Sequence, residues 1–249
     1  MKTFFLPREE WGETCTITGS EAQHICKVLR MHAGEQIRVL DGQGTEGTFE
    51  ITSVSKQNVG LRQISVTSHP VPAHQAYIAI GWGKSVRRSW IFEKAVELEA
   101  AGVWLWAADR SQSKVPEEAK ENWQAQLVAG AKQCDNPWLP ELKTLPSGVT
   151  SVVEAAESFD QCFFLWEGHK KEEMLSTEHL KKPGKTLFII GPEGGFSEAE
   201  AKLLKKGGVT PLSLGNRILR WETAALLCLG LHFWSHKSSS EMSSVTFDS

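Results

Sequence analysis

The chain has 249 residues, of which 41% are hydrophobic and 23% charged, with 30 acidic against 27 basic side chains. This composition excludes a disordered chain, and a net charge of −3 excludes a protein that binds nucleic acid through bulk positive charge. The longest apolar stretch, residues 224–234, is too short to cross a membrane, and the N-terminal apolar run is too short for a secretion signal, so we expect no membrane partner.

The cysteines indicate a reducing compartment. The five cysteines are an odd number and no two are spaced as Cys-x-x-Cys, so the sequence predicts neither a disulfide framework nor a zinc ribbon. We therefore expect a cytoplasmic protein. Cys228, His232 and His236 would share one face of a helix, but no fourth ligand is near them in the sequence, and we predict that the chain holds no metal.

The first 70 residues are predicted to form a small β domain. Its strands are expected at 14–18, 36–40, 48–54 and 58–67, with a turn at 41–44. A single helix is expected to begin after an N-cap at Ser20. Its apolar face is predicted to comprise Ala22, Ile25, Val28 and Leu29, which leaves the basic side chains of Lys27 and Arg30 in solvent.

Residues 69–74, with two prolines, are predicted to be a stiff spacer, after which strands and helices alternate. Strands are expected at 76–80, 103–107, 162–166, 187–190 and 210–214, and helices at 89–99, 117–132, 172–180, 198–206 and 222–235. Apolar strands separated by helices predict a parallel sheet covered on both faces. The expected organisation is a β domain at 1–70, an α/β domain at 75–236 and a disordered, Ser-rich tail at 237–249.

One glycine-rich loop, residues 191–197, joins an expected strand to an expected helix. Ser197 and Glu200 have the spacing of a capping box, which marks the helix start. Ligands of parallel sheets bind at the carboxyl ends of strands, and the glycines allow close approach to the backbone. The spacing is neither of the usual phosphate-binding patterns, and Glu193 would repel a pyrophosphate, so a phosphate-free ligand such as S-adenosylmethionine fits better. The alternative is a well-formed turn without a ligand.

A second loop, residues 214–223, follows the last expected strand and carries Arg217, Arg220 and Glu222. An arginine can hold an anion or a carbonyl edge through two hydrogen bonds. The alternative is a surface cluster in which the arginines merely pair with Glu222.

Together the two loops, Ile190-Gly-Pro-Glu-Gly-Gly-Phe-Ser197 and Leu214-Gly-Asn-Arg-Ile-Leu-Arg-Trp-Glu-Thr-Ala224, resemble the paired signature of the ribosomal small-subunit RNA methyltransferase RsmE family, of the SPOUT class. Val28-Leu-Arg-Met31 with Asp41-Gly42 resembles that family's N-terminal domain, and residues 93–98 resemble its first catalytic-domain helix. The sequence departs from the family at Thr3, Asn122 and Asn136, where arginines are usual.

The resemblance implies an α/β fold: a SPOUT-like catalytic domain with a C-terminal trefoil knot, preceded by a small PUA-like β-barrel. It implies S-adenosylmethionine as cofactor, 16S ribosomal RNA or the small ribosomal subunit as partner, methylation at N3 of one uridine, and a site at a homodimer interface. The expected cofactor-binding residues are Leu165, Glu167, Ile190, Gly191, Pro192, Glu193, Gly194, Gly195, Leu214, Gly215, Arg217, Ile218 and Leu219.

The chemistry of this methylation selects two candidate catalytic residues. Removing the proton from uridine N3 places negative charge on the ring, and a fixed cation stabilises charge as it develops. Arg220 is the candidate cation, and Glu222 is expected either to orient Arg220 or to assist proton removal. Trp221 is a candidate to stack on the unstacked base, and the favoured alternative is packing at a dimer interface.

Two basic patches are candidates for RNA binding, one at Lys84, Arg87 and Arg88 and one at Lys27, Arg30 and Arg38. Two other functions fit parts of the sequence. A nucleotide-binding oxidoreductase would use the glycine loop, but Glu193 disfavours it. A non-catalytic RNA-binding relative would fit the missing arginines, but the intact glycine loops disfavour it.

Overall fold

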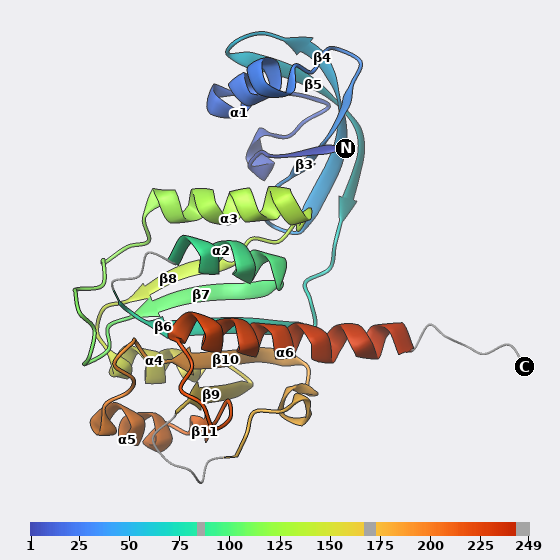
Figure 1. Cartoon of the computed structure of the whole chain (residues 1–249). Helices are drawn as coiled ribbons and strands as arrows, with labels where there is room; N and C mark the ends of the chain where they lie inside the picture. Colours follow the sequence, from blue (N-terminus) through green and yellow to red (C-terminus); the bar gives the residue numbers. More distant parts are fainter. Residues whose placement is uncertain (84–87, 167–172, 243–249) are drawn as a thin grey trace, which may run out of the picture. The chain divides into compact units, whose positions relative to one another are not determined.

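The computed structural model describes residues 1–83, 88–166 and 173–242 (Figure 1). Within it the chain forms two compact units. The first unit comprises Met1–Val71 together with Leu127–Leu139. The second comprises Pro72–Gln126 and Pro140–Ser249. The first unit thus ends within the spacer expected at 69–74, and it also includes an internal segment of the α/β domain expected at 75–236.

The first unit is built on a five-stranded sheet in the order β1-β3-β4-β5-β2. Its strands are β1 (Lys2–Phe5), β2 (Thr14–Thr18), β3 (Gln36–Leu40), β4 (Thr45–Val54) and β5 (Asn58–Ser68). β1 pairs in parallel with β3, and the other pairs are antiparallel. Phe4, Ile17 and Phe49 lie in its core. The expected turn after β3 is confirmed, because Asp41 Oδ1 accepts hydrogen bonds from the backbone N–H of Gln43 and Thr45 at 2.7 and 2.9 Å.

The helical segment of this unit changes its winding. α1 (Gly19–Gln23) continues directly into a π-helix, η2 (His24–Leu29). Ala22 and Ile25 are buried as expected, but the prediction for Val28 is wrong, since its side chain is 66% exposed. A π-helix has more residues per turn than an α-helix, so the apolar face rotates away from Val28. The segment ends at Arg30, whose backbone is left-handed (φ 53°).

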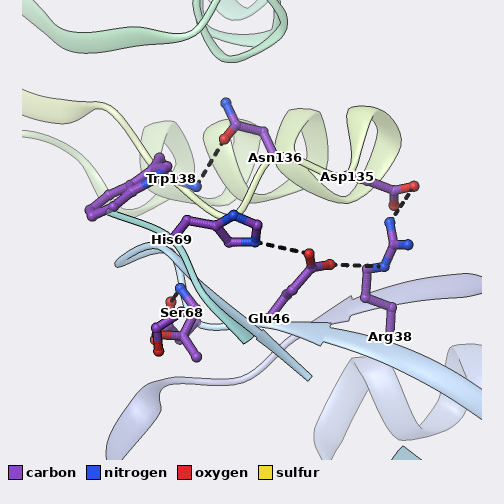
Figure 2. Close-up of polar contacts among 9 residues, drawn as sticks. Arg38, Glu46, Ser68, His69, Asp135, Asn136 and Trp138 are labelled. Atoms are coloured by element: carbon purple, nitrogen blue, oxygen red, sulfur yellow. Dashed lines mark hydrogen bonds and ion pairs between the residues drawn. The ribbon is translucent and has the colours of Figure 1, made fainter. Parts of the chain in front are cut away.

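A charged network joins the strands of the first unit to the end of α3 (Glu121–Cys134), a helix that begins in the second unit. Figure 2 shows the Arg38 guanidinium between two carboxylates, with Asp135 Oδ2 at 2.7 Å and Glu46 Oε2 at 3.1 Å. Glu46 also lies 2.9 Å from His69 Nε2, and Thr3 Oγ1 donates to Asp135 Oδ1. This network explains why residues 127–139 belong with the first unit.

Close backbone contacts support the same assignment. Gly44 N–H donates to the carbonyl of Pro137, and Leu139 N–H donates to the carbonyl of Gly42. Gly44 has φ 90°, and a Cβ there would lie 2.1 Å from the Trp138 ring, so only glycine fits under that indole. The segment after α3 is thus packed onto the β3–β4 turn.

The second unit contains a six-stranded sheet in the order β11-β9-β10-β6-β7-β8, and every pairing is parallel. The expected parallel sheet is confirmed. The strands are β6 (His74–Gly81), β7 (Ala100–Trp106), β8 (Glu141–Leu145), β9 (Gln161–Leu165), β10 (Gly184–Ile190) and β11 (Thr210–Leu212). The sequence did not predict β8, because this edge strand carries the polar residues Glu141, Lys143 and Thr144 and lacks the continuous apolar run of the other strands.

Helices cover both faces of this sheet (Figure 1). α4 (Val149–Ala156) and α5 (Glu198–Lys206) pack with one set of alternating strand residues, which includes Ala79, Trp106 and Ile189. α2 (Arg88–Glu97) contacts β7, and α6 (Trp221–Met242) contacts both β6 and β10.

Two predictions about the helices need correction. The tail was expected to be disordered from residue 237, but α6 continues to Met242, and an ion pair of 2.8 Å between Lys237 Nζ and Glu99 Oε1 anchors the extension. The helix expected at 172–180 is only a 3-10 turn at Thr177–Leu180, with its capping box between Ser176 and His179. Position 172 itself lies outside the described residues.

Three histidines pack together where α6 crosses the start of β6. The His74 and His236 rings stack with centroids 3.7 Å apart, and His232 meets His236 edge-on at 4.5 Å. Burial lowers the pKa of His232 to about 3 and that of His236 to about 4, and the neighbouring histidines add to both shifts. The folded chain therefore holds both rings neutral.

We predict that acid destabilises the protein through this cluster. Below the ordinary histidine pKa of 6.5, both histidines bind protons in the unfolded chain but stay neutral in the folded one. The free energy of unfolding therefore decreases as pH falls from 6.5 toward 4. Between pH 7.5 and 5.5 the free energy of unfolding should fall by about 1–2 kcal/mol. Urea unfolding at several pH values measures the slope. His232→Leu should reduce the slope, because only His236 then keeps a lowered pKa, whereas the control His32→Gln, at an exposed position, should leave it unchanged.

Candidate functional site

The candidate site lies at the carboxyl-terminal edge of the six-stranded sheet. Because all six strands are parallel, the loops that follow β6, β7, β9, β10 and β11 all leave from this one edge. The glycine loop, defined here as Gly191–Gly195, follows β10 directly. Leu165 and Ile190, two expected cofactor-binding residues, are buried at the ends of β9 and β10. Glu167, another, lies outside the described residues.

The glycine loop is a tight turn with one exposed corner. Gly195 N–H donates to the carbonyl of Pro192 at 2.8 Å, and Gly195 has φ 68°, in the left-handed region. Gly191 and Pro192 are buried, whereas Glu193 and Gly194 are exposed. The exposed part of the loop thus presents backbone and one carboxylate to solvent.

Two further glycines, Gly81 and Gly83, allow the end of β6 to pass directly beneath the glycine loop. A Cβ on Gly81 would lie 2.4 Å from the backbone nitrogen of Pro192, and a Cβ on Gly83 would lie 2.0 Å from Glu193 Oε2. Sequence reasoning missed both residues. The signal was present, since Gly81-Trp82-Gly83 follows an expected strand as the other glycine loop does.

The start of α5 is fixed by the expected capping box. Ser197 Oγ accepts from Glu200 N–H at 3.1 Å, and Glu200 Oε2 accepts from Ser197 N–H at 2.7 Å. Glu200 is only 1% exposed, and its Oε1 accepts from the backbone N–H of Asp109 at 2.7 Å. Arg110 completes the arrangement, because its guanidinium donates to the carbonyl of Gly194 at 2.7 Å. Asp109 and Arg110 were not predicted as site residues.

Arg88 was expected to bind RNA, but the structure gives it a structural partner. Its guanidinium lies 3.7 Å from the centre of the Trp82 ring and donates to the carbonyl of Gly83 at 2.6 Å. Burial lowers the pKa of Arg88, and the nearby Glu193 carboxylate opposes that shift. Arg88 is half-buried against the residues that follow β6, so the structure does not add it to an exposed basic patch for RNA.

The second loop exposes its cations and buries its carboxylate. Arg217, Ile218 and Arg220 are exposed, while Glu222 is 5% exposed at the start of α6. The alternative interpretation placed Glu222 at the surface with the arginines, whereas its carboxylate lies in the interior. Of the remaining expected residues, Gly215 is exposed with φ 112°, and Leu214 and Leu219 are half-buried.

The second candidate RNA patch is only partly open. Lys27 and Arg30 are exposed on the first unit, as expected. Arg38, the third member, is held between Asp135 and Glu46, which neutralise it (Figure 2). Lys84 and Arg87, of the first patch, lie outside the described residues.

Among the described residues, no group of three or more His, Cys, Asp and Glu side chains is arranged to hold a metal ion. Cys228 is fully buried, and burial raises the pKa of its thiol. No helix in the described ranges has the length and hydrophobicity needed to cross a membrane.

Comparisons with known proteins give consistent matches. Residues 69–232 match the model of the RNA methyltransferase domain, and residues 17–62 match that of the RNA methyltransferase PUA domain. The chain is 34% identical over 232 residues to ribosomal RNA small subunit methyltransferase E of Bacillus subtilis (strain 168), covering 88% of this chain and 90% of that protein. It is 27% identical to the protein of the same name from Synechocystis, covering 90% of this chain and 74% of that one.

Among solved structures, a methyltransferase from Legionella pneumophila in complex with the cofactor SAM is similar with a TM-score of 0.80 and 29% identity. The match covers 92% of this chain and 96% of that one.

The close approach between β6 and the glycine loop gives a direct prediction. Gly81→Ala places a Cβ 2.4 Å from the Pro192 backbone, so the loop must move, and we expect a loss of about 1–3 kcal/mol in the free energy of unfolding. Gly230→Ala is the control, because nothing lies near its Cβ position and alanine favours a helix. Chemical denaturation compares the two variants, and equal stability would show that the loop does not lie on β6.

Proposed function

The chain belongs to the ribosomal RNA small subunit methyltransferase E family of RNA methyltransferases, and from that premise we propose that it methylates N3 of a specific uridine in 16S ribosomal RNA. S-adenosylmethionine is the proposed methyl donor. We further propose that the catalytic domain carries the family's trefoil knot and that the protein acts as a cytoplasmic homodimer. The observation that carries the proposal is the glycine loop at the carboxyl edge of a parallel sheet.

The proposed cofactor suits the residues at this edge. Gly191–Gly195 offers backbone and tight turns but no lysine or serine pattern that would hold a phosphate. The exposed Glu193 carboxylate disfavours a pyrophosphate and suits a ligand that carries a positive sulfonium. Leu165, Ile190 and the backbone of Leu214–Leu219 are the other proposed contacts. When bound, S-adenosylmethionine supplies a methyl group on sulfur that is ready for transfer to a nucleophile.

Arg220 has the exposure that the proposed catalytic role requires. Uridine N3 must give its proton to solvent before it can form a bond to the methyl carbon, and the negative charge then spreads to O2 and O4. The Arg220 guanidinium is exposed beside the start of α6, where it can donate to these oxygens. Glu222 lies two positions after Arg220 in the sequence and is buried. Its burial suits the role of orienting Arg220 better than the role of removing the proton in contact with solvent.

The rival functions are weakened by different observations. An oxidoreductase that binds a dinucleotide would place pyrophosphate near Glu193, which is exposed in the loop. A non-catalytic RNA-binding relative would need its phosphate contacts, but Asp135 and Glu46 neutralise one expected contact, Arg38. Both glycine loops also keep the backbone that a cofactor needs.

Mass mapping of 16S RNA nucleosides tests the proposal. Undermethylated small subunits are incubated with the protein and S-adenosylmethionine, and the RNA is digested and analysed with and without protein. The proposal expects one additional 3-methyluridine. A cofactor-binding protein that adds no methyl group would be a non-catalytic relative, and a methyl group on another atom would refute the assignment to N3.

Replacement of Arg220 tests its catalytic role. Arg220→Lys keeps the charge but loses the planar fork, so single-turnover methyl transfer should slow by about 10²–10³-fold. Cofactor affinity should change little, because the glycine loops supply most of that binding. Arg8→Lys, in the first unit, is the control. A rate for Arg220→Lys within a few-fold of wild type would remove Arg220 from the mechanism.

The homodimer is tested by light scattering. Three large apolar side chains, Trp90 on α2 and Leu227 and Trp234 on α6, are exposed on two helices that pack together. Such exposure is characteristic of an interface. At micromolar concentration we expect twice the chain mass of 27.6 kDa, and Leu227→Glu should shift the population toward monomer. A single-chain mass for the unaltered protein would contradict the proposal.

A further inference from the structure

Polar side chains join the loop that follows β7 to the glycine loop and to the start of α5. We call these four residues the β7 clip: Asp109, Arg110, Ser197 and Glu200. In the sheet, β6 lies between β7 and β10. The β7 clip therefore spans the end of β6, where Gly81 and Gly83 leave room for the glycine loop. The glycine loop is thus held from below by β6 and from the side by the β7 clip.

The contacts of the β7 clip hold the start of α5 and the carboxyl-terminal part of the glycine loop. At its exposed corner, Arg110 Nη1 donates to the carbonyl of Gly194 at 2.7 Å. The Arg110 side chain also lies against one side of Gly194, since a Cβ there would lie 3.1 Å from Arg110 Cβ. Just beyond the loop, at the N-cap of α5, Ser197 Oγ donates to Asp109 Oδ2 at 2.5 Å. The buried Glu200 carboxylate accepts from the backbone N–H of both Asp109 and Ser197.

Two residues of the β7 clip, Glu200 and Arg110, make contacts that fix the position of the backbone. A buried carboxylate that accepts two backbone hydrogen bonds fixes both segments, because leaving either donor unpaired is costly. Arg110 is exposed, and its guanidinium donates a hydrogen bond to a backbone carbonyl of the loop. That bond constrains the direction of the Gly194–Gly195 peptide, next to the one left-handed residue of the loop.

We propose that Arg110 is a positioning residue that holds the glycine loop in its cofactor-binding conformation from the end of β7. This inference rests on the proposed function, because it takes the glycine loop as the S-adenosylmethionine site. Arg110 acts through the Gly194 carbonyl. Without its bond, the loop samples other conformations, and the observed affinity falls in proportion to the fraction that remains competent.

The test compares Arg110→Ala with Arg110→Lys and with a matched control. The control, Arg62→Ala, removes another exposed arginine, one that pairs with Glu50 in the first unit. Calorimetric titration should give a dissociation constant for S-adenosylmethionine about tenfold weaker for Arg110→Ala, since losing a charge-assisted hydrogen bond has about that effect. Arg110→Lys should recover part of the loss, and Arg62→Ala should bind like wild type.

Two further readouts separate positioning from a general loss of structure. Methyl transfer at saturating cofactor should be within about threefold of wild type for Arg110→Ala, so the change falls on KM. In the cofactor-free protein, amide hydrogen exchange should accelerate at 193–197 and stay unchanged in β9 and α4. Unchanged affinity and exchange in Arg110→Ala would overturn the proposal, as would faster exchange throughout the second unit.

Failure of the proposed function would look different. If the unaltered protein does not bind S-adenosylmethionine, the cofactor assignment fails whatever the variants do. The exchange measurement needs no cofactor, so it still reports whether Arg110 holds the loop.

Discussion

Parallel pairing is the constraint on which this site depends, because it brings the ends of six strands to one edge of the sheet. β10 delivers the glycine loop to that edge, and β6 ends beneath it without side chains at Gly81 and Gly83. α5 begins from the far end of the loop through the Ser197–Glu200 capping box. The glycine loop, the end of β6 and the start of α5 together leave Glu193 and Gly194 exposed to solvent.

Charge at this edge is separated in a way that suits transfer of a cationic methyl group to an anionic base. The glycine loop carries one exposed carboxylate, Glu193, whereas the loop after β11 exposes Arg217 and Arg220. A sulfonium favours the first and a uridine anion the second. Arg88 does not add to the positive surface, because its guanidinium is stacked on Trp82.

Much of this arrangement could be predicted from sequence, for identifiable reasons. The alternation of apolar strands and helices predicts the parallel sheet, and the capping box marks the start of α5 at Glu198, where the structure has it. Predictions failed where the structure depends on contacts between residues far apart in the sequence or on an irregular helix. The π-helix exposes Val28, and Asp135 draws the end of α3 to Arg38, which no local pattern reveals. The hydrogen bond from Arg110 to Gly194 joins residues 84 positions apart, so spacing along the chain could not disclose it.

The central claim is that this edge of the sheet binds a phosphate-free, cationic nucleoside. Parallel calorimetric titrations of the full chain with S-adenosylmethionine and with NAD measure it most directly, with Gly195→Val, which strains the left-handed residue of the loop, as the site control. The account predicts saturable binding of S-adenosylmethionine, no binding of NAD, and loss of the signal in Gly195→Val. Binding of NAD alone, or S-adenosylmethionine binding that is unaffected by Gly195→Val, would contradict it.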